Sequence, residues 1–96
     1  MTLEELRTNR RNEILELAAR RGARRVRVFG SIVQGDNRPE SDVDFLVDME
    51  PGRTLFDLSG LVLDLERLLG ASVDVVTEAG LRSRIRDRVL SEAVPL

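Results

Sequence analysis

The sequence predicts an α/β (α+β) fold with a small mixed sheet of three to four strands and helices on one face. Short β-favouring runs alternate along the chain with longer segments whose apolar residues recur at helical spacing. Glycine, proline or polar turns separate these segments. A chain of 96 residues has room for one small domain, which we expect to span residues 1–96 without repeats or an internal linker.

The first predicted element is an amphipathic helix near the amino terminus. Thr2 followed by Glu5 fits a capping box, which satisfies backbone N–H groups at the start of a helix. Gly22 offers a stop. Between these positions one helical face is apolar, with Leu3, Leu6, Ile14, Leu17 and Ala18.

Two strands with a short helix between them come next. Residues 25–29 are β-favouring and end at Gly30. Ser31 can cap a brief helix that Gly35 ends. A polar turn follows, and residues 42–49 form the second predicted strand.

The second half of the chain predicts a long helix, a third strand and a last helix. Thr54 caps the long helix and Gly70 ends it. One face of this helix is apolar, with Leu55, Leu58, Leu61, Val62, Leu65, Leu68 and Leu69. Residues 72–77 form the third strand. The last helix follows from apolar residues at four-residue steps, Leu81, Ile85 and Val89.

Two aspartates alternate with apolar residues at the start of the second strand. Side chains alternate between the two faces of a strand, so Asp42 and Asp44 share one face. The other face is apolar, with Val43, Phe45 and Val47. Alternate residues lie about 7 Å apart along a strand, close enough for two carboxylates to share cations. Magnesium favours oxygen ligands and keeps waters and substrate phosphates, so an open carboxylate pair suits it.

Asp74 is the candidate third carboxylate. Two ions roughly 4 Å apart can hold the attacking and leaving oxygens of a phosphoryl displacement, and such an arrangement usually needs a third acid. Asp74 lies in the third predicted strand and stands beside the pair if the two strands are neighbours. It would then complete one metal site and accept the proton of the attacking hydroxyl.

The Gly30–Ser31 turn is the candidate phosphate-binding site. Because a strand ends at Gly30 and a helix opens at Ser31, exposed N–H groups and the positive helix end face the same edge of the sheet. Gly30 lets an oxygen approach the backbone, and the Ser31 hydroxyl adds a donor. Each signal alone is commonly just a turn or a solvated strand, whereas their combination at this spacing is specific.

The charge layout also places the acids at the centre of the chain. Residues 30–78 hold eleven acids against three arginines, whereas both ends are rich in arginine. The central acids suit cations, and the arginines suit an acidic partner, nucleic acid or solvent.

The sequence has no membrane-spanning apolar run, no secretory signal and no cysteine, which predicts a cytoplasmic protein.

The segment VFGSIVQGDNRPESDVDFLVD resembles the signature of the nucleotidyltransferase superfamily that includes DNA polymerase beta. The likeness runs through most of the chain, including LFDLSGLVLDLERLLG, SVDVV and the closing arginine-rich helix. In its length the chain resembles the minimal members of the superfamily, the MNT antitoxins that are paired with HEPN toxins.

This resemblance implies magnesium-dependent transfer of AMP from ATP to a hydroxyl, with two Mg2+ ions in the site. In the antitoxin group the acceptor is a tyrosine of the HEPN ribonuclease, which is thereby silenced. Carried over by position, Gly30 and Ser31 match the triphosphate-binding pair. Asp42 and Asp44 match the metal-binding pair, and Asp74 matches the third carboxylate.

One position departs from the family pattern. Members often have arginine before the second glycine of this loop, where this chain has Gln34 before Gly35. Glutamine lacks the positive charge, and Arg38 and Arg53 are candidates to replace it. The chain also has no tyrosine, so a tyrosine acceptor must lie on another chain, expected to be a HEPN-type toxin encoded nearby.

Other functions stay open at this point. The chain can instead be a non-catalytic antitoxin that neutralises the toxin by binding. Transfer to a small molecule such as an aminoglycoside is disfavoured, because related enzymes of that kind carry a further domain for the acceptor. Nucleic-acid binding is disfavoured because aromatic residues are not interleaved among Arg20, Arg21, Arg24, Arg25 and Arg27. The oligomeric state is open.

Overall fold

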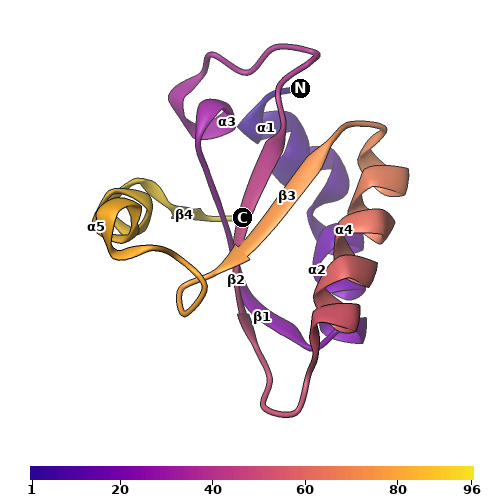
Figure 1. Cartoon of the computed structure of the whole chain (residues 1–96). Helices are drawn as coiled ribbons and strands as arrows, with labels where there is room; N and C mark the ends of the chain where they lie inside the picture. Colours follow the sequence, from indigo (N-terminus) through magenta and orange to yellow (C-terminus); the bar gives the residue numbers. More distant parts are fainter.

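The computed structural model describes all 96 residues and contains a four-stranded sheet with helices on both sides (Figure 1). The strands are β1 (Ala23–Phe29), β2 (Val43–Met49), β3 (Val73–Thr77) and β4 (Val94–Pro95). The helices are α1 (Leu3–Glu5), the π-helical stretch Leu6–Arg10, α2 (Arg11–Arg20), α3 (Ser31–Gln34), α4 (Leu55–Leu69) and α5 (Ser83–Glu92). None of these helices has the length and apolar character needed to cross a membrane.

The helices and strands predicted from the sequence are all present. The Thr2 hydroxyl accepts a hydrogen bond from the Glu5 N–H at 3.1 Å, and Thr54 caps α4 in a complete capping box. The strand boundaries move by one or two residues. In particular, Asp42 lies just before β2 rather than in it. The short strand β4 was not predicted from the sequence. With it the sheet has four strands, within the predicted three to four.

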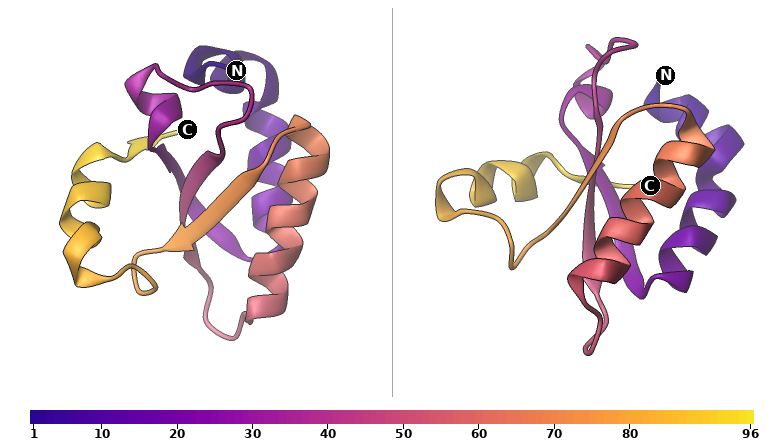
Figure 2. Two further views of the ribbon diagram at one scale, coloured as in Figure 1. Left: turned by 45° about the horizontal axis from the view of Figure 1, so that its top comes forward. Right: turned by 45° about the vertical axis from the view of Figure 1, so that its right-hand side comes forward.

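The strand order β3-β2-β1-β4 explains where the last helix lies. β2 and β3 are parallel, and β1 is antiparallel to both β2 and β4. The chain passes from β2 to β3 through α4, and then from β3 back across the sheet to β4 through α5. Right-handed crossovers in opposite directions need opposite faces of the sheet. The expected helix layer on one face is therefore formed by α2 and α4, while α5 lies on the other side (Figure 2).

The main core lies between the sheet and the pair α2 and α4. We call this side of the sheet the packed face; on β2 it carries Val43, Phe45 and Val47. Ile14 of α2 and Leu61 of α4 are fully buried against it, as is Phe45. We call the opposite side the site face; it carries Asp44, Leu46 and Asp74.

Candidate active site

Two aspartates lie at the start of β2. Val43 and Phe45 are at most 1% exposed within the core, so Asp44 between them points to the site face. Asp44 is half-buried, and Asp42, one position before the strand, is exposed. The alternation of carboxylates and core residues that the sequence predicts is present in the structure.

Asp74 lies directly beside Asp44 on the neighbouring strand. β2 and β3 pair in parallel with Asp44 aligned to Asp74. Aligned side chains of neighbouring strands point to the same face, and the strands are about 4.8 Å apart. The side chain of Asp74 is exposed. The strand pairing on which the sequence prediction for Asp74 depended is therefore present.

The carboxyl group of Asp44 sits in an electrostatically unfavourable place. Its pKa is raised from 3.8 to about 6, first by burial and then by the negative charges of Asp74 and Asp42. All three causes disfavour the ionised carboxylate. None of the ion pairs within the chain involves these three aspartates. Surplus negative charge of this kind is typical of a place that receives a cation.

The donor set suits magnesium, although the carboxylates do not converge by themselves. No group of three acidic side chains lies close enough together to hold a metal ion alone. Magnesium commonly takes only one or two carboxylates and completes its shell with waters and substrate phosphates. The hard oxygens of Asp42, Asp44 and Asp74, together with the uncompensated charge at Asp44, therefore fit this ion.

Gly30 brings the end of β1 against Asp44. Phe29 is aligned with Asp44 across the antiparallel pair of β1 and β2, so Gly30 reaches the edge of the sheet where the aspartates begin. The backbone of Gly30 has φ 77° and ψ −149°, a conformation that glycine alone adopts readily. A Cβ atom at this position would overlap Asp44 Oδ2. The backbone can therefore turn beside the carboxylate with no side chain between them.

Ser31 opens the short helix α3 next to this turn. The N–H groups of Val33 and Gln34 both donate to the Gly30 carbonyl. The N–H groups before them have no partner inside the helix, as at any helix start. Asn37 Nδ2 donates to Ser31 Oγ at 3.2 Å and so orients the hydroxyl. Asn37 could not be identified from the sequence, because an asparagine shortly after a glycine has the appearance of an ordinary turn residue.

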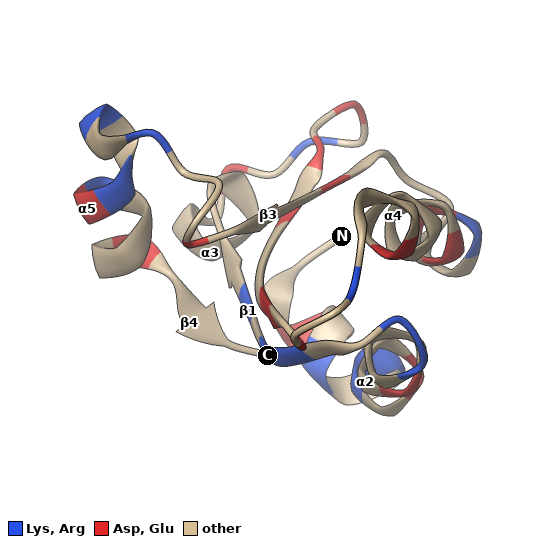
Figure 3. Cartoon of the chain, turned by 60° about the horizontal axis from the view of Figure 1, so that its bottom comes forward, with Lys and Arg blue, Asp and Glu red and all other residues tan.

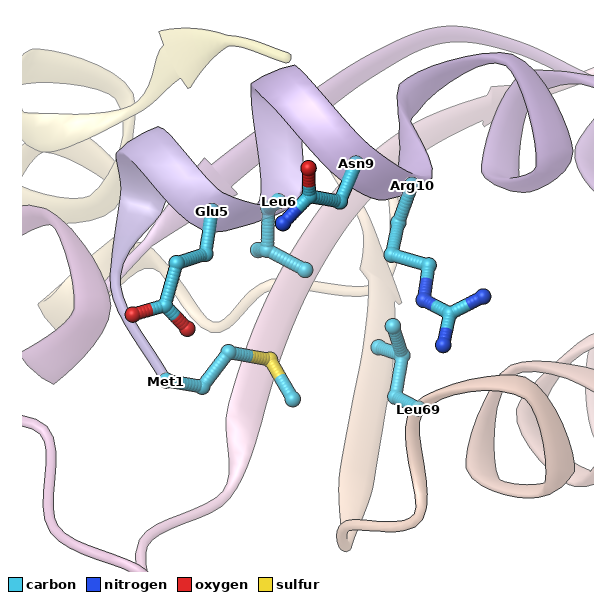
Figure 4. Close-up of a pocket in the computed structure, with 6 residues that line it drawn as sticks. All are labelled: Met1, Glu5, Leu6, Asn9, Arg10 and Leu69. Carbon is cyan, nitrogen blue, oxygen red and sulfur yellow. The ribbon is translucent and has the colours of Figure 1, made fainter.

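The largest pocket of the molecule lies elsewhere. It has a volume of about 470 Å³ and lies between the amino-terminal helix and the end of α4 (Figure 4), lined by Met1, Glu5, Leu6, Asn9, Arg10 and Leu69. Glu5 supplies its one carboxylate, so it lacks paired groups for acid–base or metal chemistry. No pocket includes Asp42, Asp44 or Asp74. The carboxylates therefore lie on an open surface, and we place the candidate site there on chemical grounds.

Most arginines considered for nucleic-acid contacts are engaged within the chain. Ion pairs to neighbouring acids occupy Arg20, Arg21, Arg25 and Arg27. Arg27 is only 7% exposed, because a bulge between Arg24 and Arg27 changes the alternation of β1. Only Arg24 of this set has no ion pair, which further disfavours a nucleic-acid surface on β1.

The two arginines considered as replacements for the charge missing at Gln34 lie at opposite ends of β2. Arg53 follows the far end of the strand and pairs with Glu50 at 3.5 Å and Asp57 at 3.4 Å. Its assignment as a replacement is therefore wrong. Arg38 lies in the connection between α3 and β2, and its side chain is exposed.

Comparison with known proteins gives matches over nearly the whole chain. Residues 11–96 match the family model described as a nucleotidyltransferase domain. The protein adenylyltransferase MntA of Thermococcus cleftensis is 43% identical over 94 residues, which cover 98% of this chain and 95% of that protein. A Methanocaldococcus jannaschii protein named as a candidate protein adenylyltransferase is 36% identical over 84 residues, which cover 88% of this chain and 90% of that protein.

Solved structures share the fold. One, of a candidate minimal nucleotidyltransferase, has a TM-score of 0.87 at 56% identity and covers 100% of this chain and 97% of that chain. A crystal structure of a toxin–antitoxin with AMP-PNP has a TM-score of 0.76 at 22% identity and covers 90% of this chain and 71% of that chain. At the lower identity the likeness concerns the fold alone.

Proposed function

This chain belongs to the nucleotidyltransferase domain family, and on that premise we propose that it transfers AMP from ATP to a hydroxyl of a partner toxin and acts as its antitoxin. The observation that carries the proposal is the alignment of Asp44 with Asp74, beside the Gly30 turn. Relatives named as protein adenylyltransferases support AMP as the transferred group. Neighbours that are toxin–antitoxin structures support a toxin as the partner.

Gly30 and Ser31 are proposed to bind the triphosphate of ATP. The Gly30 backbone admits a phosphate oxygen without a steric barrier. The free N–H groups at the start of α3 and the Ser31 hydroxyl are donors suited to that oxygen. The bond from Asn37 to Ser31 Oγ keeps the hydroxyl in place, so Asn37 is a positioning residue for this phosphate-binding site.

Asp42, Asp44 and Asp74 are proposed to hold Mg2+, with two ions expected. When bound, magnesium neutralises phosphate charge and orients the reacting oxygens. Bound cations would also relieve the repulsion among these carboxylates, which is one cause of the raised pKa of Asp44.

The proposed transfer forms one bond and breaks one. The acceptor oxygen bonds to the α-phosphorus of ATP, the link between the α- and β-phosphates breaks, and pyrophosphate leaves. The hydroxyl proton needs a base, and we assign this role to Asp74 because its carboxylate is exposed beside Asp44.

The acceptor is proposed to be a tyrosine of a HEPN-type toxin encoded nearby. This chain contains no tyrosine, so a tyrosine acceptor must come from another chain. The carboxylates lie on an open surface rather than in a pocket, which leaves room for a protein to approach them. We also propose that the protein is cytoplasmic and that residues 1–96 form a single domain.

The test is transfer of label from ATP labelled in the α-phosphate to the toxin encoded beside this chain, in the presence of magnesium. We expect the wild type to label the toxin and Asp42→Ala to label it at least about 100-fold more slowly, because metal-site losses are of this size or larger. Glu4→Ala, an exposed acid on α1, is the matched control and should keep full activity. An unlabelled toxin, or equal labelling by Asp42→Ala, would contradict the proposal.

The same variants separate catalysis from inhibition by contact alone. If transfer of AMP is the mechanism, the double variant Asp42→Ala, Asp44→Ala should bind the toxin but fail to neutralise it. Full neutralisation by this double variant would favour the non-catalytic antitoxin instead.

A further inference from the structure

The first half of α5 has no buried side. All seven side chains from Arg82 to Arg88 are exposed, and Val89 is the first buried residue of the helix. Ile85, in the middle of the run, is 47% exposed. In α2 and α4, by contrast, buried residues recur along the helix. A surface helix normally owes its stability to a buried apolar stripe, and this part of α5 has none.

The exposed part of α5 carries a concentration of unpaired positive charge. Arginine occupies every second position from Arg82 to Arg88, and Asp87 is the one acid among them. Figure 3 shows the basic segments of α5 in blue. Arg88 pairs with Glu92 at 3.1 Å, while Arg82, Arg84 and Arg86 form no ion pair. On α2, by contrast, Arg20 is paired with Glu16 of the same helix at 2.7 Å. The charges of α5 are therefore available to a partner.

Local interactions do not stabilise this half of the helix. Arg82 occupies the cap position without a side-chain hydrogen bond, and the first turn contains no acid. Positive charge at a helix start opposes the helix dipole. The pairs Arg82 with Arg86 and Arg84 with Arg88 have four-residue spacing, at which like charges repel. A helix of 10 residues under these conditions needs contacts from outside itself.

α5 also borders the candidate active site. It leaves the sheet after β3, which carries Asp74, and returns to β4 beside β1, which leads to Gly30. It lies on the side of the sheet opposite α2 and α4 (Figure 2), the side to which Asp44 and Asp74 point. A protein that brings a hydroxyl to these aspartates therefore approaches the face that α5 flanks.

We propose that the exposed half of α5, from Arg82 to Arg88, is the docking surface for an acidic segment of the acceptor protein. The proposal rests on the proposed function, because it names the acceptor as the occupant. Arginine forms paired hydrogen bonds with carboxylates, and acidic side chains would replace the repulsion among these arginines with attraction. Ile85 offers the same segment an apolar contact in the middle of the charged surface.

A protein fits this surface better than RNA does. Single-stranded RNA is held by aromatic stacking beside positive charge, and α5 contains no aromatic residue. The acids Asp42, Asp44 and Asp74 on the same side would repel a run of phosphates that extends beyond the bound nucleotide. An acidic segment of limited length avoids this repulsion while it contacts the arginines.

Hydrogen exchange of the full chain tests the proposal directly. In the free chain, the backbone amides of residues 85–88 should exchange within about tenfold of an unstructured peptide, because little holds this half of the helix. Addition of the toxin encoded beside this chain should slow them by at least about tenfold. Amides already protected in the dilute free chain, protection that grows with chain concentration alone, or protection by an RNA oligonucleotide but not by the toxin would each overturn the proposal.

Charge reversal provides the second measurement. Arg84→Glu with Arg86→Glu should raise KM for the toxin by at least about tenfold and leave binding of a non-hydrolysable ATP analogue unchanged. The matched control reverses Arg11 and Arg67, which are also exposed and unpaired but lie on the helices of the packed face. Equal weakening by both double variants would contradict a specific surface.

The outcomes also distinguish this proposal from the proposed function. If the toxin protects α5 but no AMP is transferred, the docking surface stands and the transfer is wrong. If AMP is transferred while α5 stays unprotected, the transfer stands and the docking surface is wrong.

Discussion

The packed face and the site face of the sheet differ in their energetics: one stabilises the fold, and the other holds a carboxylate in an unfavourable environment. On the packed face, Val43, Phe45 and Val47 are buried against α2 and α4, and the arrangement lowers the free energy by removing apolar surface from water. On the site face, Asp44 is placed where burial and neighbouring charges oppose its ionisation. Both sets of residues alternate along the same strand.

This difference shows how a small domain separates stability from chemistry. Side chains on opposite faces of a strand do not touch, so the apolar residues of the packed face can stabilise β2 while Asp44 carries unfavourable charge on the other face. Changes on the packed face should therefore reduce stability and spare transfer in folded molecules. Changes on the site face should reduce transfer and leave the stability of the fold largely unchanged.

The largest expected effect on stability comes from the packed face. Phe45→Ala removes a fully buried aromatic ring and should lower the free energy of unfolding by about 3–5 kcal/mol. Chemical denaturation measures this loss, and transfer by the remaining folded molecules should persist. Leu63→Ala, at a position 52% exposed, is the control and should change stability by less than about 0.5 kcal/mol. Similar losses from both variants would contradict the account of the core.

Gly30→Ala should have the next largest effect, this time on the site face. The added methyl group overlaps Asp44 Oδ2 and the backbone conformation becomes strained, so we expect transfer to fall about 100-fold. Gly52→Ala is a matched control, because Gly52 has φ 85° but no atom within 4 Å of its Cβ position. It should lose stability from strain and keep its transfer rate. If both variants lose transfer equally, the contact between Gly30 and Asp44 is irrelevant.

Thr54→Ala tests the end of α4 far from the carboxylates. The substitution removes a complete capping box and should lower the free energy of unfolding by about 1 kcal/mol, with the transfer rate unchanged. Thermal unfolding and the labelling assay measure the two quantities on one preparation. A loss of transfer in molecules that remain folded would show that the two faces are coupled.

The smallest effect is a pH dependence that comes from Asp44. Because its folded-state pKa is raised to about 6, protonation of Asp44 stabilises the fold below about pH 4, and this stabilisation is lost as the pH rises through about 6. Without magnesium, the wild type should therefore lose stability relative to Asp44→Asn across this range. Since Asp44 is only half-buried, the change should be at most about 1 kcal/mol. A constant difference between the two proteins from pH 4 to about pH 7 would contradict the assigned pKa.

The sequence predicted those features that depend on short-range patterns. Alternation alone placed Asp42 and Asp44 opposite the core, and the cap at Thr54 and the stop at Gly70 located α4. The position of Asp74 depended on β2 and β3 being neighbours, which the sequence could only suggest. Once the pairing is known, the match of Asp44 with Asp74 follows from the register.

Features that depend on strand order or on irregular backbone geometry could not be predicted from the sequence. The face on which α5 lies follows from β3 and β4 being opposite edges of the sheet, and no local pattern reports strand order. Arg27 was grouped with surface arginines, because the bulge that aligns it with the buried Leu46 has no recognisable signature. Arg53 was considered as a phosphate contact, although the length of β2 carries it to the far end of the sheet.

The most direct test of the separation between the two faces is Asp44→Asn, examined for transfer and stability on the same sample. Asparagine keeps the shape of the side chain and removes the charge that we propose binds the metal. We expect magnesium-dependent labelling of the toxin to disappear, while the free energy of unfolding at pH 7 without magnesium stays equal to that of the wild type or rises. Labelling at the wild-type rate, or a loss of labelling explained by unfolding of the variant, would contradict it.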